Sequence, residues 1–246
     1  MTVTTPPYAE LVAFVRGEGE AIVSASRQGL DAPVTTCGDW TVGDLCRHVG
    51  RVYAYAAHLV EHRLTSASDV RPDPPADTDP AEWVAETLDD LVAALGGCDP
   101  DTPTWNWSAS SPHVASFWAR RMAHESAVHR YDAQRAFGVA QPVDADLAAD
   151  GLDEFIDVLA PRIVERDNVS DAAATYRFAS TEGEAWQVRF ADGGIARADA
   201  DAVADVTVRG TTSALLLAVY NRVPWTSLEV DGDAGALERW SANLRF

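Results

Sequence analysis

The fold of the N-terminal half is decided by the stretch Thr41-Val-Gly-Asp-Leu-Cys-Arg-His-Val-Gly-Arg-Val-Tyr-Ala-Tyr-Ala-Ala-His-Leu59. Its apolar residues recur every three or four positions and form one stripe, which predicts an amphipathic helix. Thr41 and Asp44 have the spacing of a capping box, so we expect the helix to begin there. His48 lies three residues after Leu45 and four before Val52, so its imidazole shares the buried stripe.

A second predicted helix, residues 112–137, carries two further polar groups on one face. Glu125 and His129 are four residues apart, which places their side chains about 40° apart around the helix axis. If this helix packs antiparallel to the first, one imidazole faces a carboxylate and a second imidazole. Two histidines and one glutamate are a common ligand set for Zn²⁺ or a similar divalent ion and leave a position open for substrate. We therefore predict a metal site formed by His48, Glu125 and His129.

These residues could also have purely structural roles. A histidine on an apolar face is usually a hydrogen-bonded core residue, and a Glu–His pair at this spacing is usually a surface pair. A zinc-peptidase HExxH motif is excluded, because His124 and His129 are five residues apart and their imidazoles point about 140° apart. His58 and His62 lie about 21 Å along the first helix from the predicted site and do not complete it.

Two other side chains near the predicted ligands need an interpretation. Cys46 points about 200° around the helix from His48, so a small buried thiol is the better interpretation than a ligand. Asp132 is either a carboxylate that orients a ligand imidazole or a solvated acid near Arg121 or Arg135. The sequence leaves these two possibilities for Asp132 open.

The rest of the chain divides into a helical part and a mixed part. Helices are predicted at 8–30, 81–95 and 144–164, strands at 175–179, 186–190, 195–197, 203–209 and 227–230, and short helices at 211–220 and 233–243. This order predicts an α plus α/β protein, with a helical bundle over residues 1–168 and a small mixed α/β domain over residues 169–246.

Composition narrows the class of protein. The 246 residues carry a net charge of −19, and all 19 basic residues are arginines. Such an acidic surface repels phosphate backbones and speaks against nucleic acid or an anionic membrane as partner. The three cysteines are too few for a disulfide framework, and neither a secretory signal nor a membrane helix is recognisable, so we expect a cytoplasmic protein.

Two motifs and the C-terminal part resemble a known family. The segments Cys37-Gly-Asp-Trp-Thr-Val-Gly-Asp-Leu-Cys-Arg-His48 and Arg121-Met-Ala-His-Glu-Ser-Ala-Val-His-Arg-Tyr-Asp132 resemble motifs of the mycothiol-dependent maleylpyruvate isomerases, a branch of the DinB-like metal-binding bundles. Residues 206–240 are similar to that family's small sterol-carrier-like α/β domain. Gly38 departs from the Pro that many relatives have after this Cys, but it lies in a loop.

The resemblance implies specific roles. In that family the residues matching His48, Glu125 and His129 bind the metal, commonly zinc, and mycothiol is the thiol cosubstrate. The residue matching Arg222 is implicated in activity, although an arginine at a helix end is also a favourable cap. Arg121 and Arg222 are the candidate cations for binding an anionic substrate such as maleylpyruvate, an unsaturated acid. A thiol bound to a dication loses its proton and becomes a nucleophile.

Several functions are compatible with these residues. The thiolate either adds to a cis double bond, allows rotation and leaves, as in an isomerase, or stays attached to an electrophile, as in an S-transferase. Metal-bound water as the nucleophile would make the protein a hydrolase that needs no thiol. In a non-catalytic binding module, the metal would be structural and the C-terminal domain would hold an apolar ligand.

Overall fold

The computed structural model describes residues 4–169, 173–191 and 194–245 and divides the chain into two compact units. The first is a four-helix bundle within Pro6–Trp107 and Ser111–Val143, and the second is built mainly from Asp144–Phe246. The helical N-terminal part followed by a small mixed sheet confirms the predicted fold class. Among the described residues, no helix has the length and apolar character needed to cross a membrane.

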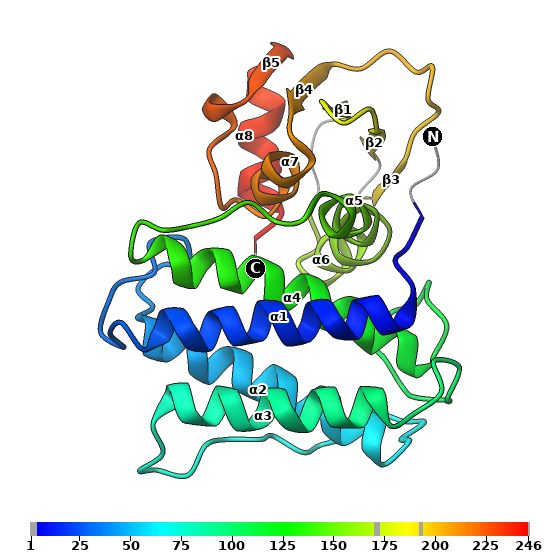
Figure 1. The fold of residues 1–246 in the computed structure, drawn as a ribbon. Helices are drawn as coiled ribbons and strands as arrows, with labels where there is room; N and C mark the ends of the chain where they lie inside the picture. The colour runs from blue at the N-terminus through cyan, green and yellow to red at the C-terminus, as the bar shows by residue number, and fades with distance from the viewer. Residues whose placement is uncertain (1–3, 170–172, 192–193, 246) are drawn as a thin grey trace. The chain divides into compact units, whose positions relative to one another are not determined.

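The bundle contains α1 (Tyr8–Ser26), α2 (Val42–Glu61), α3 (Pro80–Gly96) and α4 (Ala115–Arg135). Helix α1 packs along α4, and α2 packs along α3 (Figure 1). The Trp83 ring of α3 lies directly against Gly50 of α2, where an added Cβ atom would come within 2.7 Å of the ring. A glycine at this position therefore lets the two helices approach closely.

The start of α2 confirms the predicted capping box. The Thr41 N–H donates to Asp44 Oδ2 at 3.0 Å, and the Asp44 N–H donates to Thr41 Oγ1 at 3.2 Å. These bonds satisfy backbone groups that have no partner within the helix. They fix the first turn of α2 and hence the rotation at which His48 leaves the helix.

Helix α4 begins three residues later than the sequence predicts. Val114 has extended backbone angles and forms an isolated antiparallel bridge with Pro103, so the chain enters the helix only at Ala115. The pairing partner lies in the loop before the predicted helix, and the local pattern around Pro112 does not reveal it.

The C-terminal unit begins with a helix in three parts: α5 (Ala145–Glu154), the π-helical turn η1 (Phe155–Leu159) and α6 (Ala160–Arg166). Pro161 has no N–H to donate to the carbonyl of Asp157, and the register changes so that the Ala160 N–H bonds Phe155 O. Ser110 Oγ donates to the released Asp157 carbonyl at 3.3 Å.

These helices group with the sheet, so the compact unit begins at Asp144 rather than at residue 169, the start of the predicted second domain. Their apolar faces pack against elements of the C-terminal unit: α5 against α7 (Thr212–Val219), and α6 against β3 (Gly194–Arg197). A helical pattern alone does not say which core a helix joins.

The five-stranded sheet has the order β3-β2-β1-β4-β5. Its other strands are β1 (Ala174–Ser180), β2 (Ala185–Ala191), β4 (Val206–Gly210) and β5 (Glu229–Gly232). Only β1 and β4 pair in parallel, and in that register Phe178 lies beside Val208. The short helix η2 (Trp225–Ser227) precedes β5, and α8 (Ala234–Asn243) follows it, with Trp240 packing on Tyr176 and Phe178.

Candidate metal centre

Helix α2 presents His48 at the edge of its buried stripe. Leu45 and Val49 on the same helix are fully buried, whereas the His48 side chain keeps 35% of its surface exposed. Its ring lies 5.0 Å from the ring of Trp40, at an angle of 48°. His48 is therefore held by an aromatic neighbour on one side and remains open to solvent on another.

Helix α4 presents Glu125 and His129 one turn apart on the same face, as the sequence predicts. Their side chains are less exposed than that of His48, at 18% and 9%. Beside them, the hydroxyl of Tyr53 on α2 lies 2.6 Å from Ser126 Oγ, with which it forms a hydrogen bond. The Ser126 hydroxyl donates in turn to Met122 O. Burial raises the pKa of Tyr53, so the phenol stays protonated and joins α2 to α4 next to the site.

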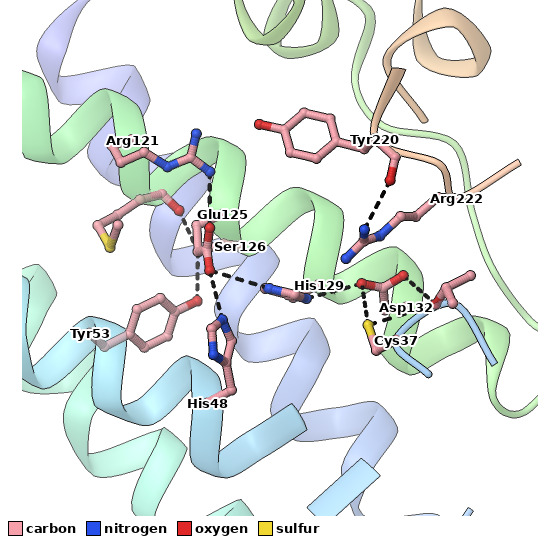
Figure 2. Close-up of polar contacts among 12 residues, drawn as sticks. Cys37, His48, Tyr53, Arg121, Glu125, Ser126, His129, Asp132, Tyr220 and Arg222 are labelled. Atoms are coloured by element: carbon pink, nitrogen blue, oxygen red, sulfur yellow. Dashed lines mark hydrogen bonds and ion pairs between the residues drawn. The ribbon is translucent and has the colours of Figure 1, made fainter. Parts of the chain in front are cut away.

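The three predicted ligands meet at one point (Figure 2). His48 Nε2 and His129 Nε2 each lie 3.2 Å from Glu125 Oε1, and the two imidazole rings are 5.0 Å apart. One ligand atom from each residue lies within 4.8 Å of the others. Two imidazole nitrogens and a carboxylate oxygen that converge in this way fit a single divalent ion such as Zn²⁺.

Arg121 holds the other oxygen of the glutamate. Its Nη2 donates to Glu125 Oε2 at 3.0 Å, and the arginine is 4% exposed. Because Oε2 is occupied by Arg121, Oε1 is the oxygen that faces the two imidazoles. The contact seen for Arg121 is thus with a predicted ligand, and binding of a cosubstrate by this residue stays a prediction.

The pKa values of the metal-free cluster follow from its charges. Burial by itself would raise the pKa of Glu125, but His129, His48 and Arg121 together hold it well below its usual range. Burial would likewise lower the pKa of His129, but Glu125 and Asp132 hold it well above its usual range. The metal-free cluster therefore favours the protonated form of His129, and a metal at Nε2 would compete with the proton there.

A second group of polar side chains lies on the far side of His129. Asp132 Oδ2 accepts from His129 Nδ1 at 3.0 Å, and Asp132 Oδ1 accepts from Thr36 Oγ1 at 2.6 Å. Cys37 Sγ lies 3.5 Å from Asp132 Oδ2. Cys37, His129 and Asp132 thus form a second possible ligand group, which uses the opposite nitrogen of the same imidazole.

The structure resolves the two interpretations of Asp132. Its side chain is 0% exposed and contacts His129, so it is not a solvated acid. Arg135 instead donates to Tyr131 OH at 3.1 Å. Thr36, Cys37 and Trp40 are contacts that helix periodicity missed, because all three lie in the loop before α2. Cys37 and Trp40 fall within a motif quoted for the family resemblance, whereas Thr36 lies just before it.

The other histidines and Cys46 lie apart from these groups. His124 is buried and belongs to neither potential ligand group among the described residues. His58 and His62 stack on each other at the end of α2, with ring centroids 4.6 Å apart. Cys46 is fully buried, which raises the pKa of its thiol to about 11 and confirms the prediction of a buried structural thiol.

Arg222 belongs to the C-terminal unit and follows the end of α7. Its Nη1 donates to the carbonyl of Tyr220, the residue that caps this helix, at 2.9 Å. Asn221 between them has a positive φ of 61°, which turns the chain back toward the helix end. The bond to Tyr220 agrees with the expected capping contact, and a role of Arg222 in a reaction stays a prediction.

Comparisons with known proteins concern the family and the fold of this chain. Residues 9–134 match the model of the mycothiol maleylpyruvate isomerase N-terminal domain, and residues 146–239 match that of the MDMPI C-terminal domain. Two crystal structures of the mycothiol-dependent maleylpyruvate isomerase, one of them a mutant, align over 95% of this chain and 97% of theirs with TM-scores of 0.64. The mutant is 12% identical to this chain and the other structure 11%, so the likeness concerns the fold. No curated protein matches the chain.

Proposed function

Because the chain belongs to the mycothiol maleylpyruvate isomerase family, we propose that it is a metal-dependent enzyme that uses mycothiol to isomerise a maleylpyruvate-like cis-unsaturated acid. The observation that carries the proposal is the convergence of His48 Nε2 and His129 Nε2 on Glu125 Oε1. A divalent ion held by these residues, Zn²⁺ by preference, supplies the positive charge that keeps a thiol in its thiolate form.

The reaction needs the thiol as a catalyst and returns it unchanged. The thiolate sulfur forms a bond to one carbon of the cis double bond, and the electron pair moves into the conjugated carbonyl group. The remaining carbon–carbon single bond rotates. The electron pair then returns, the carbon–sulfur bond breaks, and the trans acid and the thiolate separate.

The charges of the ligand set suit an anionic nucleophile and an anionic substrate. Glu125 contributes the only negative charge among the three ligands, and Arg121 contributes a positive charge 3.0 Å from it. Even with the buried carboxylate of Asp132 beside His129 counted, these groups would not neutralise a bound dication, so the site would keep a net positive charge within a protein of net charge −19. The exposed flank of His48 leaves a side of the site open for these anions.

Two arginines are proposed to act on the substrate. Arg121 contributes its positive field through the buried pair with Glu125, and binding of the cosubstrate by Arg121 remains part of the proposal. Arg222 is proposed as a catalytic residue on the strength of the family resemblance, with its guanidinium binding a carboxylate of the substrate.

The proposal is tested with metal-stripped and zinc-reloaded protein, each assayed with and without mycothiol on a cis-unsaturated keto acid. We expect turnover to the trans acid only when both zinc and thiol are present. Full turnover after rigorous metal removal would contradict the proposed metal dependence. Cleavage of the acid by water without thiol would identify a hydrolase, and accumulation of a stable thioether would identify S-transfer in place of isomerisation.

A further inference from the structure

The two imidazoles of the metal centre differ in what lies behind them. His48 is backed by the Trp40 ring, whereas His129 is backed by a carboxylate: Asp132 Oδ2 lies 3.0 Å from His129 Nδ1. A pair at this spacing on a helix is usually a solvated surface contact worth little. Here the Asp132 side chain is 0% exposed, so its bonds are not shared with water.

Asp132 is itself held in place from outside its helix. Thr36 Oγ1 donates to Asp132 Oδ1 at 2.6 Å, across 96 positions of sequence. The loop that carries Thr36 is fixed by an isolated bridge between Pro33 and Thr41 and by the bond from the Val34 N–H to Trp40 O. Each carboxylate oxygen of Asp132 therefore has a defined partner, and the carboxylate has one orientation toward His129.

We propose that Asp132 is a positioning residue for the metal centre: it accepts the Nδ1 proton of His129 and thereby makes Nε2 the nitrogen that faces the metal, while Thr36 holds Asp132. A neutral imidazole has one N–H and one acceptor nitrogen, so a fixed acceptor at Nδ1 selects the form with an open lone pair at Nε2. The inference rests on the proposed metal-binding function and adds the residues that align one ligand.

The second ligand group offers a competing arrangement, in which Cys37 Sγ, His129 Nδ1 and Asp132 bind the ion themselves. That arrangement would turn His129 Nδ1 away from its role as donor to Asp132. It would also leave the converging ligand atoms of His48 and Glu125 without a metal ion to bind. The geometry favours the first group, because it brings together two imidazole nitrogens and one carboxylate oxygen, a common zinc ligand set, whereas Thr36 holds Asp132 as an outer partner of His129.

The test measures zinc affinity by competition with a chromophoric chelator. For Asp132→Ala we expect zinc binding about 10- to 100-fold weaker, the range usual for loss of such an outer partner. Asp132→Asn should recover much of the affinity, because its amide oxygen still accepts from Nδ1. Thr36→Val should show a smaller loss, and Cys37→Ser should stay within about twofold of the wild type.

A second readout separates positioning from a purely structural role. The visible spectrum of the cobalt-loaded protein reports ligand geometry, and we expect it to change in Asp132→Ala and to return toward the wild-type spectrum in Asp132→Asn. Asp153→Ala is the matched control, because it removes a carboxylate bonded to Trp186 Nε1 in the other unit. This control should lower stability without changing zinc affinity or the cobalt spectrum.

Three results would overturn the inference. Zinc affinity of Asp132→Ala within twofold of the wild type would show that His129 needs no positioning partner. A large loss in Cys37→Ser with none in His48→Ala would place the ion in the competing group. Absence of zinc binding by the wild-type protein would overturn the proposed metal dependence together with this inference, whereas either of the first two results leaves metal dependence standing.

Discussion

Helix α4 of the bundle and the three central strands of the C-terminal sheet, β2, β1 and β4, both bury side chains but differ in the kind that they bury. Five arginine, histidine and aspartate residues of α4 are less than 10% exposed: Arg121, His124, His129, Arg130 and Asp132. The sheet buries mostly aromatic and aliphatic residues, among them Tyr176, Phe178, Trp186 and Val208, and its buried polar residue Gln187 is the exception. Helix α4 thus buries ionisable groups away from water, and the sheet buries apolar surface.

This difference indicates that α4 carries the candidate site and that the sheet mainly stabilises the fold. Burying an ionised group costs free energy unless the group is paired and hydrogen-bonded, so a cluster of them indicates a site whose polarity is used. The α4 cluster meets that condition, as in the pairs of Arg121 with Glu125 and of Arg130 with Glu18. Apolar burial in the sheet instead stabilises the fold directly.

The largest effect is expected from removing His48, the most exposed of the three proposed metal ligands. His48→Ala should lower zinc affinity and thiol-dependent turnover by more than about 100-fold, because even outer partners of a metal ligand contribute about 10- to 100-fold. Turnover assays and chelator competition measure both quantities. His58→Ala on the same helix is the matched control and should leave them unchanged. If His48→Ala only lowered the melting temperature, a structural metal in a binding module would be the correct interpretation.

The next effect lies in the aromatic core. Trp240 is 2% exposed and packs on Phe155, Tyr176 and Phe178. Trp240→Ala should reduce the free energy of unfolding by about 3–5 kcal/mol, measured by urea titration, because it leaves a large cavity. Zinc affinity of the folded protein should not change. Val203, which is 91% exposed, provides the control: Val203→Ala should stay within about 0.5 kcal/mol of the wild type.

Arg222 provides a smaller test on the C-terminal unit. Arg222→Gln should lower kcat/KM for the acid substrate by about 10- to 100-fold, since a hydrogen bond to a charged group contributes about 1.5–3 kcal/mol. Arg209→Gln is a control on β4, where Arg209 pairs with Glu229 at 3.7 Å, and should leave kcat/KM unchanged. Equal activity of Arg222→Gln and the wild type would exclude the proposed catalytic role and leave Arg222 with only its structural bond to the Tyr220 carbonyl.

The smallest effect is a pH dependence of the metal-free protein. The raised pKa of His129 stabilises the fold fully below pH 6.5, its ordinary value, and this contribution is lost as the pH rises through the folded-state pKa. The lowered pKa of Glu125 gives a second contribution to the stability of the fold. This contribution is fully present above pH 4.5, the ordinary value for a glutamate, and is lost as the pH falls through the folded-state pKa. The stability difference between wild type and His129→Gln should therefore be largest between pH 4.5 and 6.5.

Calorimetry of the two metal-free proteins across this range checks the window. A difference that grows steadily above pH 6.5 would contradict the assigned charges. Adding zinc should reverse the trend above pH 6.5 and stabilise the wild type more as the pH rises, because metal binding competes with the proton on His129 Nε2.

What the sequence by itself determined is local and periodic. The capping box of Thr41 and Asp44, the stripe that includes His48, and the shared face of Glu125 and His129 all follow from repeats of three or four residues. A helix has a fixed rotation per residue, so these positions are settled as soon as the helix is recognised. The three candidate ligands could therefore be named before any contact was seen.

What only the tertiary structure decided depends on residues far apart in the chain. Thr36 reaches Asp132 across 96 positions. Closer in sequence, the bridge between Pro103 and Val114 sets the start of α4 from outside the helix. Helices α5 and α6 give a further example. The sequence predicts that these residues are helical, but it does not predict that the helices pack in the core of the C-terminal unit. Such contacts are selected by the packing of whole helices and loops, which no local period encodes. For this reason the sequence could name Asp132 and leave its role open, and only the folded chain shows the carboxylate behind His129.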